Sequence, residues 1–284
     1  MQIQSFFDQS TSTFTHLVWD SATGDAAVID PVLDFDYKSG STGTVSADAV
    51  IAALDAHGLK LHYIFETHAH ADHVSAAPYL KAQRGGKVVI GRHITTVQAV
   101  FKKVFNLDDL TPDGGQFDLL VDEGDELKLG NLIIRVMNTP GHTPACVSYQ
   151  VGDAVFIGDT LFSPAAGSAR ADFPGGDAHA LYQSVTRLLS LPEDTRLFLC
   201  HDYPAPGVAP VACTTVAEQK HNNIHFQGQE IDYIKMRTAR DATLEMPMLI
   251  LPSIQINIRA GAFPAPENNG VSYLKLPLNQ FQEA

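Results

Sequence analysis

The stretch Thr67–His73 constrains the fold of this chain more than any other part of the sequence. It reads THAHADH, so three imidazoles and one carboxylate fall within one short segment. The preceding run, LHYIFE at 61–66, is apolar and rich in β-forming residues, which predicts a buried strand. Ser75 and Pro78 then suit the first turn of a helix. The histidine cluster is therefore expected on a strand-to-helix loop, where its side chains can converge on one point.

The residue types in this loop indicate a metal site. Neutral imidazole and carboxylate are ligands that suit zinc, iron or manganese. The alternative is a polar loop whose histidines hydrogen-bond only to water. Four titratable side chains within six positions, directly after a buried strand, favour the metal site: His68, His70, Asp72 and His73.

Three later segments repeat this design and can complete the site. His142 stands at the apex of a turn framed by proline and glycine, NTPGHTP at 138–144. Asp159 follows the apolar run 154–157, and His201 follows a similar run. Taken singly, each of these residues is weak evidence. Four apolar strands that each end in a metal-competent group predict one shared centre, held by a rigid scaffold.

The order of these motifs resembles a known family. The chain resembles the metallo-β-lactamase superfamily, and six motifs carry the resemblance. They are THAHADH (67–73), GHTPAC (141–146), GDTLF (158–162), ARADF (169–173), CHDY (200–203) and LPSIQINIRAG (251–261). Within it the chain is similar to the glyoxalase II-like branch and, most closely, to the persulfide dioxygenases. The resemblance runs along nearly the whole chain. It implies a four-layer αββα sandwich with two facing mixed β-sheets, whereas the sequence pattern alone predicts only a mixed α/β fold.

We expect a single domain over 1–284 that consists of two αβ halves, about 1–120 and 121–284, and a short C-terminal substrate-binding extension. At 284 residues the chain is long enough to bury a sizeable core. Periodicity and capping signals predict helices, listed here by their ranges: 47–57, 94–105, 178–190, 215–222 and 230–242.

The resemblance leaves the metal content open between two arrangements. A persulfide dioxygenase holds one Fe(II) with two histidines and a carboxylate, which match His68, His142 and Asp159 here. The remaining residues would then orient these ligands through hydrogen bonds: His70, Asp72, His73 and His201. A hydrolase of a glutathione thioester instead uses all seven side chains to hold two Zn(II) ions, bridged by Asp159.

Features outside the ligand set favour the dioxygenase, which oxidises glutathione persulfide with O2 to sulfite and glutathione. The sequence has His-Asp-Tyr at 201–203, where glyoxalase II enzymes typically have His-Glu-Tyr and a longer helical C-terminal region. Arg170 and Arg259 match arginines of the dioxygenases, and a guanidinium fork suits the carboxylates of glutathione. Tyr203 is expected to point its hydroxyl into the site. The competing interpretations are surface salt bridges for the arginines and a core position for the tyrosine.

The composition excludes several classes of partner. A net charge of −13 argues against nucleic acid and anionic membrane surfaces. No apolar run approaches the ~20 residues needed to cross a bilayer. The three cysteines have no CxxC spacing, which suits a reducing cytoplasm. We expect a cytoplasmic homo-oligomer, a dimer in the first instance.

Overall fold

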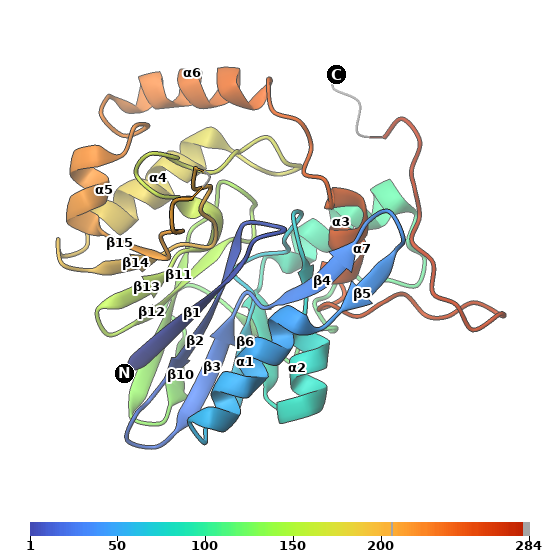
Figure 1. Cartoon of the computed structure of the whole chain (residues 1–284). Coiled ribbons are helices and arrows are strands. Elements are labelled where there is room, and N and C mark those ends of the chain that lie inside the picture. Colours follow the sequence, from blue (N-terminus) through green and yellow to red (C-terminus); the bar gives the residue numbers. More distant parts are fainter. Residues whose placement is uncertain (206, 281–284) are drawn as a thin grey trace.

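Two six-stranded sheets face each other and carry helices on their outer sides (Figure 1). The structure is a computed structural model and describes residues 1–205 and 207–280. The mixed α/β class and the αββα sandwich expected from the resemblance are confirmed. Within the described ranges, no helix is long and apolar enough to cross a membrane.

The first sheet combines an antiparallel edge with a parallel interior. β1, β2 and β3 pair antiparallel, whereas β3, β6, β8 and β9 run parallel. Parallel neighbours need a crossover, and a helix follows each of the first three parallel strands. In spatial order the strands are β1 (Gln2–Asp8), β2 (Thr13–Trp19), β3 (Asp25–Ile29), β6 (Lys60–Phe65), β8 (Lys87–Gly91) and β9 (Leu119–Val121).

The second sheet is mostly antiparallel, with one parallel pair between β13 and β14. The helix α4 makes the crossover between these two strands. In spatial order the strands are β10 (Glu126–Leu129), β11 (Leu132–Asn138), β12 (Val147–Val151), β13 (Ala154–Phe156), β14 (Arg196–Phe198) and β15 (Cys213–Thr215). A small third sheet joins β4 (Val32–Asp36), β5 (Ser41–Gly43) and β7 (Val74–Ser75).

Three apolar clusters fill the spaces between the four layers. The central cluster lies between the sheets and joins Ile29 and Phe65 of the first to Tyr149 and Phe156 of the second. A second cluster packs the outer face of the first sheet against α1 (Val45–Ala56), α2 (Ala77–Arg84), α3 (Ile94–Phe105) and α7 (Ile250–Asn257). The third packs the second sheet against α4 (Ala178–Leu189), α5 (Val216–Asn222) and α6 (Glu230–Asp241).

The C-terminal helix α7 links the two halves of the chain. It follows the second half in sequence, but its isoleucines Ile250 and Ile254 pack with the helices of the first sheet. Sequence periodicity did not predict α7, because its mixed apolar and polar residues are buried on nearly every side. Strand β1 was missed as well: it is a half-buried edge strand whose sequence, QIQSFFD, does not keep a regular alternation of apolar and polar residues. The predicted helix 94–105 and the capping box of Thr215 with Glu218 are confirmed.

His16 on β2 makes the stability of this fold sensitive to acid. Its Nε2–H donates to the carbonyl of Leu199 (2.9 Å), and the Ser5 hydroxyl donates to its Nδ1 (2.8 Å). Burial lowers the pKa of His16 from 6.5 to about 4. Between these two values the unfolded chain binds a proton that the folded chain does not. This residue's contribution is therefore intact above pH 6.5 and is lost as the pH falls toward 4.

We expect His16→Gln to flatten the pH dependence of stability. The substitution lowers the free energy of unfolding at pH 7, since the histidine is buried and bonded on both nitrogens. From pH 7 to pH 5, however, the wild type should lose about 2 kcal/mol that the variant does not lose, at about 1.4 kcal/mol per unit of pKa shift. Urea denaturation of both proteins at the two pH values measures this difference. If the free energy of unfolding changes equally with pH in both proteins, His16 is not the source of the acid sensitivity.

Candidate metal centre

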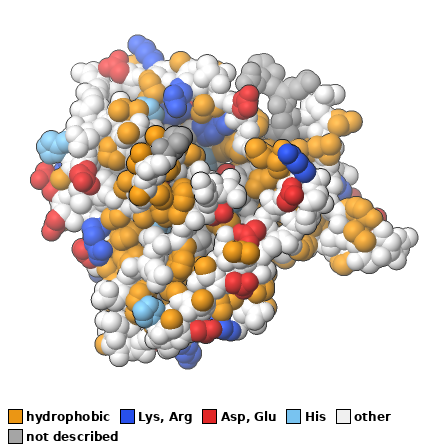
Figure 2. All heavy atoms as spheres, viewed as in Figure 1, with side chains coloured by type: hydrophobic (Ala, Val, Ile, Leu, Met, Phe, Trp, Pro, Cys, Tyr) orange, Lys and Arg blue, Asp and Glu red, His pale blue; other side chains and the backbone are white. Residues whose placement is uncertain are grey.

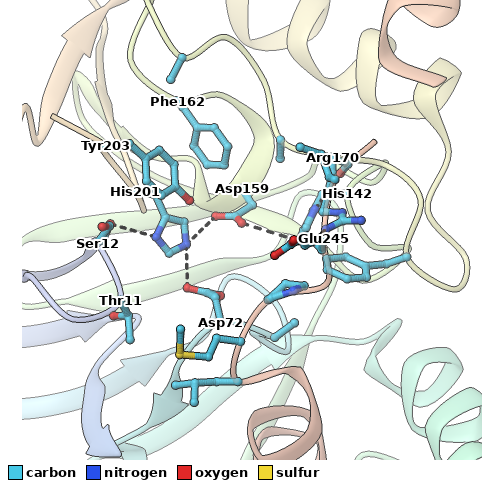
Figure 3. Close-up of a pocket in the computed structure, with 18 of the residues that line it drawn as sticks. Thr11, Ser12, Asp72, His142, Asp159, Phe162, Arg170, His201, Tyr203 and Glu245 are labelled. Atoms are coloured by element: carbon cyan, nitrogen blue, oxygen red, sulfur yellow. Dashed lines mark hydrogen bonds and ion pairs between the residues drawn. The ribbon is translucent and has the colours of Figure 1, made fainter. Parts of the chain in front are cut away.

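The strand ends of both sheets deliver their polar side chains to one place (Figure 3). His68 lies on the loop after β6 of the first sheet. His142 lies between β11 and β12, and Asp159 lies in a short 3-10 turn after β13. His201 follows β14 and forms an isolated bridge with Thr13. The site is therefore built at the seam between the two halves of the fold.

Three of these side chains form one group of ligand atoms that could hold a metal ion. The ligand atoms of His68, His142 and Asp159 lie within 4.8 Å of one another, and all three side chains are buried. Asp159 Oδ2 lies 4.0 Å from His68 Nε2 and 3.7 Å from His142 Nε2. Two ligands bonded to one ion at about 2.1 Å each are at most about 4.2 Å apart, so both separations allow a shared ion.

A second group surrounds His201. Its Nε2 lies between two carboxylates, 3.2 Å from Asp72 Oδ2 and 3.3 Å from Asp159 Oδ1 (Figure 3). His73 directs its Nδ1 to Asp72 at 3.3 Å, and His70 groups with Asp72 and His73. Asp159 thus faces both groups, one through each carboxylate oxygen.

The hydrogen bonds around His68 fix its tautomer. The hydroxyl of Thr67 donates to Asp30 (2.9 Å), so it must accept from His68 Nδ1–H at 3.0 Å. His142 Nδ1–H likewise donates to the carbonyl of Arg170 (2.8 Å). Both rings therefore present the lone pair of Nε2 toward Asp159, which is the arrangement usual for metal-bound histidine.

Asp30 accepts hydrogen bonds from the histidine loop of this centre, although the sequence analysis gave it no chemical role. Its carboxylate accepts from the backbone N–H of Thr67 (2.7 Å) and from His70 Nε2–H (2.9 Å). Burial alone would raise the pKa of Asp30, but His70 lowers it to about 2, so the group is an anion. Asp30 has φ of +50°, a conformation that Asp and Asn adopt more readily than most residues. The sequence signal was an aspartate directly after a buried strand.

Two more residues absent from the sequence prediction hold the histidine loop in place. Asn257 of α7 donates to the carbonyls of His70 and His73, both at 2.8 Å, and accepts from the N–H of Ser75. The hydroxyl of Ser75 in turn donates to Glu66, which is buried beside His70. Asn257 lies 184 residues along the chain from His73, so no local pattern could connect the two.

Two glycines allow the loops to approach closely. Gly158 has φ of +51°, and a Cβ there would lie 2.6 Å from the hydroxyl of Thr67. Gly141 has φ of +139°, and its Cβ would lie 2.3 Å from the backbone of Leu181 on α4. Each glycine directly precedes a residue predicted to be a ligand, so a larger side chain at either position would displace Asp159 or His142.

The charges of the centre are divided between its two groups. Burial, followed by the charge of His70, holds the pKa of His68 well below its ordinary value, so this ring is neutral. Burial would raise the pKa of Asp159, but His201 and His68 hold it below its ordinary value. Burial would lower the pKa of His201, yet Asp159 and Asp72 raise it to about 9. In the chain alone, His201 therefore carries a proton at neutral pH.

The donor set fits a bound metal. Several buried atoms have no hydrogen-bond partner, and they include His68 Nε2, His70 Nδ1, His73 Nε2, His201 Nε2 and Asp159 Oδ1. A buried polar atom without a partner costs about 1–3 kcal/mol. On all four of these histidines, the other ring nitrogen contacts an oxygen. A cation on His68, His142 and Asp159 would give Nε2 of His68 a partner, and an ion near His70, Asp72 and His73 could do the same for the nitrogens there.

A cavity of about 960 Å³ opens over the centre, and Figure 2 shows a hollow in the surface with basic side chains along its upper edge. Its floor is formed by Asp72, His142, Asp159 and His201. Tyr203 lies over this floor, stacked beside His201, and points its hydroxyl toward Asp159 (Figure 3). The volume suits a ligand of drug or small-peptide size.

The two arginines expected to bind substrate have carboxylate partners within the chain. Arg170 lines the cavity, but its Nε and one terminal nitrogen donate to Asp172, both at 2.6 Å. Its other terminal nitrogen donates to the carbonyl of Glu245 (2.7 Å). Arg259 pairs with Asp109 through two contacts of 2.9 Å, and it is not among the residues that line the cavity.

Fold and site together define a metal-binding enzyme domain of the αββα class. The family model described as the metallo-beta-lactamase superfamily matches residues 11–201. The chain belongs to this superfamily.

Several relatives carry names from both branches that the sequence resembles. A probable metallo-hydrolase of Burkholderia pseudomallei is 53% identical and covers 98% of this chain and 99% of its own length. Glyoxylase B2 of Dictyostelium discoideum is 44% identical, and the match covers 99% of this chain and 98% of that protein. The persulfide dioxygenase ETHE1 of mouse is 29% identical, and the match covers 93% of this chain and 90% of that protein. The chain also matches longer β-lactamase hydrolase-like proteins, of whose length it spans 64–66%.

Among solved structures, the ETHE1 protein of Myxococcus xanthus is similar with a TM-score of 0.74 at 31% identity. The match covers 92% of this chain and all of that one. Together the comparisons support a metal-binding enzyme of the metallo-β-lactamase superfamily.

We expect Asp30→Asn to weaken metal binding about 10- to 100-fold, the usual cost of losing a residue that orients a ligand. Asparagine tolerates the positive φ and keeps the shape, but it removes the anion that orients His70 and Thr67. Inductively coupled plasma mass spectrometry after dialysis against a graded chelator measures the change. The matched control is Asp20→Asn: Asp20 is equally buried and accepts from Ala22 and Asn131, away from the centre. Equal metal loss in both variants would contradict the role of Asp30.

We expect the first and second metal equivalents to differ in proton release. The first, on neutral His68 and ionised Asp159, should release little. A second equivalent that uses His201 must displace the proton this ring holds up to a pH of about 9. Calorimetric titration at pH 7 in buffers of different ionisation enthalpy counts these protons. About one proton released with the first equivalent would place the first ion on His201 instead.

Proposed function

We propose that this protein is a persulfide dioxygenase that holds one Fe(II) on His68, His142 and Asp159. The observation that carries the proposal is the convergence of these three buried ligand atoms, while His70 turns its Nε2 to Asp30. Two histidines and one carboxylate are the ligand set of non-haem iron oxygenases. When bound, such an iron offers open positions for the substrate sulfur and dioxygen.

The overall reaction balances without a further cofactor. Glutathione persulfide, O2 and water give glutathione, sulfite and two protons. The outer sulfur of the persulfide is oxidised, the dioxygen is reduced, and the sulfur–sulfur bond breaks. Glutathione then leaves with a protonated thiol.

The surrounding residues have separate tasks in this proposal. The carbonyl of Arg170 orients His142, and Thr67 orients His68, so neither ring can turn away from the ion. Protonated His201 between Asp72 and Asp159 supplies the positive charge that a second metal would otherwise supply. Tyr203 forms part of the cavity wall over the centre, where its hydroxyl can donate to a bound substrate.

A binuclear hydrolase of a glutathione thioester is the second candidate. The free Nδ1 of His70 and the free Nε2 of His73 favour it, because they could hold a second ion. Nε2 of His201 could join them once its proton is displaced. The names of the metallo-hydrolase and glyoxylase relatives also favour it. The similarity to the mouse persulfide dioxygenase and to the Myxococcus xanthus structure supports the first candidate.

Metal analysis combined with oxygen uptake tests the proposal. Protein purified without added metal should contain one iron per chain and consume O2 with glutathione persulfide, with sulfite as product. Two zinc ions per chain and no sulfite would end this interpretation. Rapid hydrolysis of a lactoylglutathione-type thioester without oxygen would support the hydrolase.

We expect His142→Ala and His73→Ala to separate a ligand from an orienting residue. His142→Ala removes one of three protein ligands, so iron content and activity should both be lost. His73→Ala deletes only a hydrogen bond near the centre, with a cost of about 10- to 100-fold in affinity or activity. Iron should remain measurable in the second variant. Equal loss of metal in both would move the assignment to the binuclear hydrolase.

The location and assembly of the protein belong to the same proposal. We expect a cytoplasmic enzyme that forms a homo-oligomer, a dimer in the first instance. Light scattering of the purified protein measures the assembly, and a monomeric mass at all concentrations would contradict it.

A further inference from the structure

One arginine of this protein has no ion-pair partner among the residues that the structure describes. The chain has nine arginines, and eight of them contact a carboxylate. The exception is Arg240, which is exposed near the end of α6 and lines the cavity over the metal centre. The pairs are Arg84–Asp55, Arg92–Asp122, Arg135–Glu126, Arg170–Asp172, Arg187–Glu123, Arg196–Asp153, Arg237–Asp241 and Arg259–Asp109.

The other arginines of the cavity wall have no comparable freedom. Arg237 is 1% exposed and uses its donors on Asp241 and on the carbonyl of Ser168. Arg170 forms a fork with Asp172 and bonds a backbone carbonyl. A ligand carboxylate would have to displace an internal partner at either position. No lysine lines this cavity in the described chain, so Arg240 is its one cation without a carboxylate partner.

The charge of Arg240 acts on the cavity side of α6. Burial is the largest cause that lowers the pKa of His225 to about 4, and the charges of Arg237 and Arg240 add to it. His225 bonds the N–H of Ser168, which lines the cavity. Arg240 also lies in the last turn of α6, where a cation interacts favourably with the helix dipole. That interaction stabilises a helix but does not explain an unpaired guanidinium beside a cavity.

We propose that Arg240 binds a carboxylate of the substrate, at the end remote from the reacting sulfur. The inference rests on the proposed function for the identity of the sulfur compound, and it adds the group that recognises its anionic end. A planar guanidinium with free donors binds a carboxylate through two parallel hydrogen bonds. The substrate class is thus a small thiol derivative with a carboxylate, of a size that a cavity of about 960 Å³ can enclose.

Binding of an unreactive analogue tests this role without turnover. S-methylglutathione titrated calorimetrically into the metal-loaded protein should bind Arg240→Gln about 10- to 100-fold more weakly than wild type, the usual loss for a charge-assisted hydrogen bond. Arg240→Lys should lie between the two, because it keeps the charge but loses the fork. The diethyl ester of S-methylglutathione, which has no carboxylate, should bind all three proteins equally.

Lys235→Gln is the matched control, because it removes a positive charge from an exposed position on the same helix that does not line the cavity. It should leave the affinity for S-methylglutathione unchanged. Equal weakening by Lys235→Gln, equal loss with the diester, or no effect of Arg240→Gln would each overturn the inference.

Kinetics separate this inference from the proposed function. If wild type consumes O2 with glutathione persulfide but Arg240→Gln has the same kcat/KM, the dioxygenase stands and the role of Arg240 falls. If no oxygen is consumed but binding of S-methylglutathione depends on Arg240, the dioxygenase activity is rejected and the carboxylate-binding role of Arg240 is supported. In the expected case, Arg240→Gln raises KM with kcat and iron content unchanged.

Discussion

The burial of imidazoles and carboxylates at the seam between two sheets is the constraint on which the rest of this structure depends. The loops of the first sheet supply His68, His70 and His73, and those of the second supply His142, Asp159 and His201. Four of the histidines contact an oxygen through one ring nitrogen and have no hydrogen-bond partner on the other: His68, His70, His73 and His201. A cation held from both sides would give several of these atoms a partner, so the metal would join the two halves as well as carry the chemistry. The direct backbone bond from Phe14 to Cys200 joins the halves beside it.

The sequence predicted the side chains that converge at the centre better than the residues that hold them in place. A ligand at the end of an apolar strand has a local signal, as with Asp159 after Ala154–Phe156. The residues that hold the histidine loop act across long distances in the chain: Asp30 accepts from the ring of His70, and Asn257 of α7 donates to the carbonyls of His70 and His73. The helix Ile94–Phe105, which has one apolar face, was predicted to the residue, whereas the edge strand β1 and the buried helix α7 lack that periodicity.

The arginines illustrate a different limit of sequence reasoning. A motif match can assign a positive charge to a binding role, but it does not reveal whether a carboxylate of the same chain already neutralises that charge. Asp172 lies two residues from Arg170 and Asp109 lies 150 residues from Arg259, so only the first partner could have been suspected. Arg240 had no motif, and its significance comes from the absence of a partner among the described residues.

This absence gains weight from the charge of the whole chain. With a net charge of −13, the long-range field of the protein repels an anionic substrate, and Asp72 and Asp159 add negative charge to the floor of the cavity. Paired arginines do little to offset this field, because each is neutralised by a carboxylate a few ångströms away. An unpaired guanidinium at the cavity wall reverses the field only locally, within about a Debye length of 8–10 Å. It would therefore admit an anion in one orientation, with its carboxylate at Arg240 and its sulfur directed toward the metal centre.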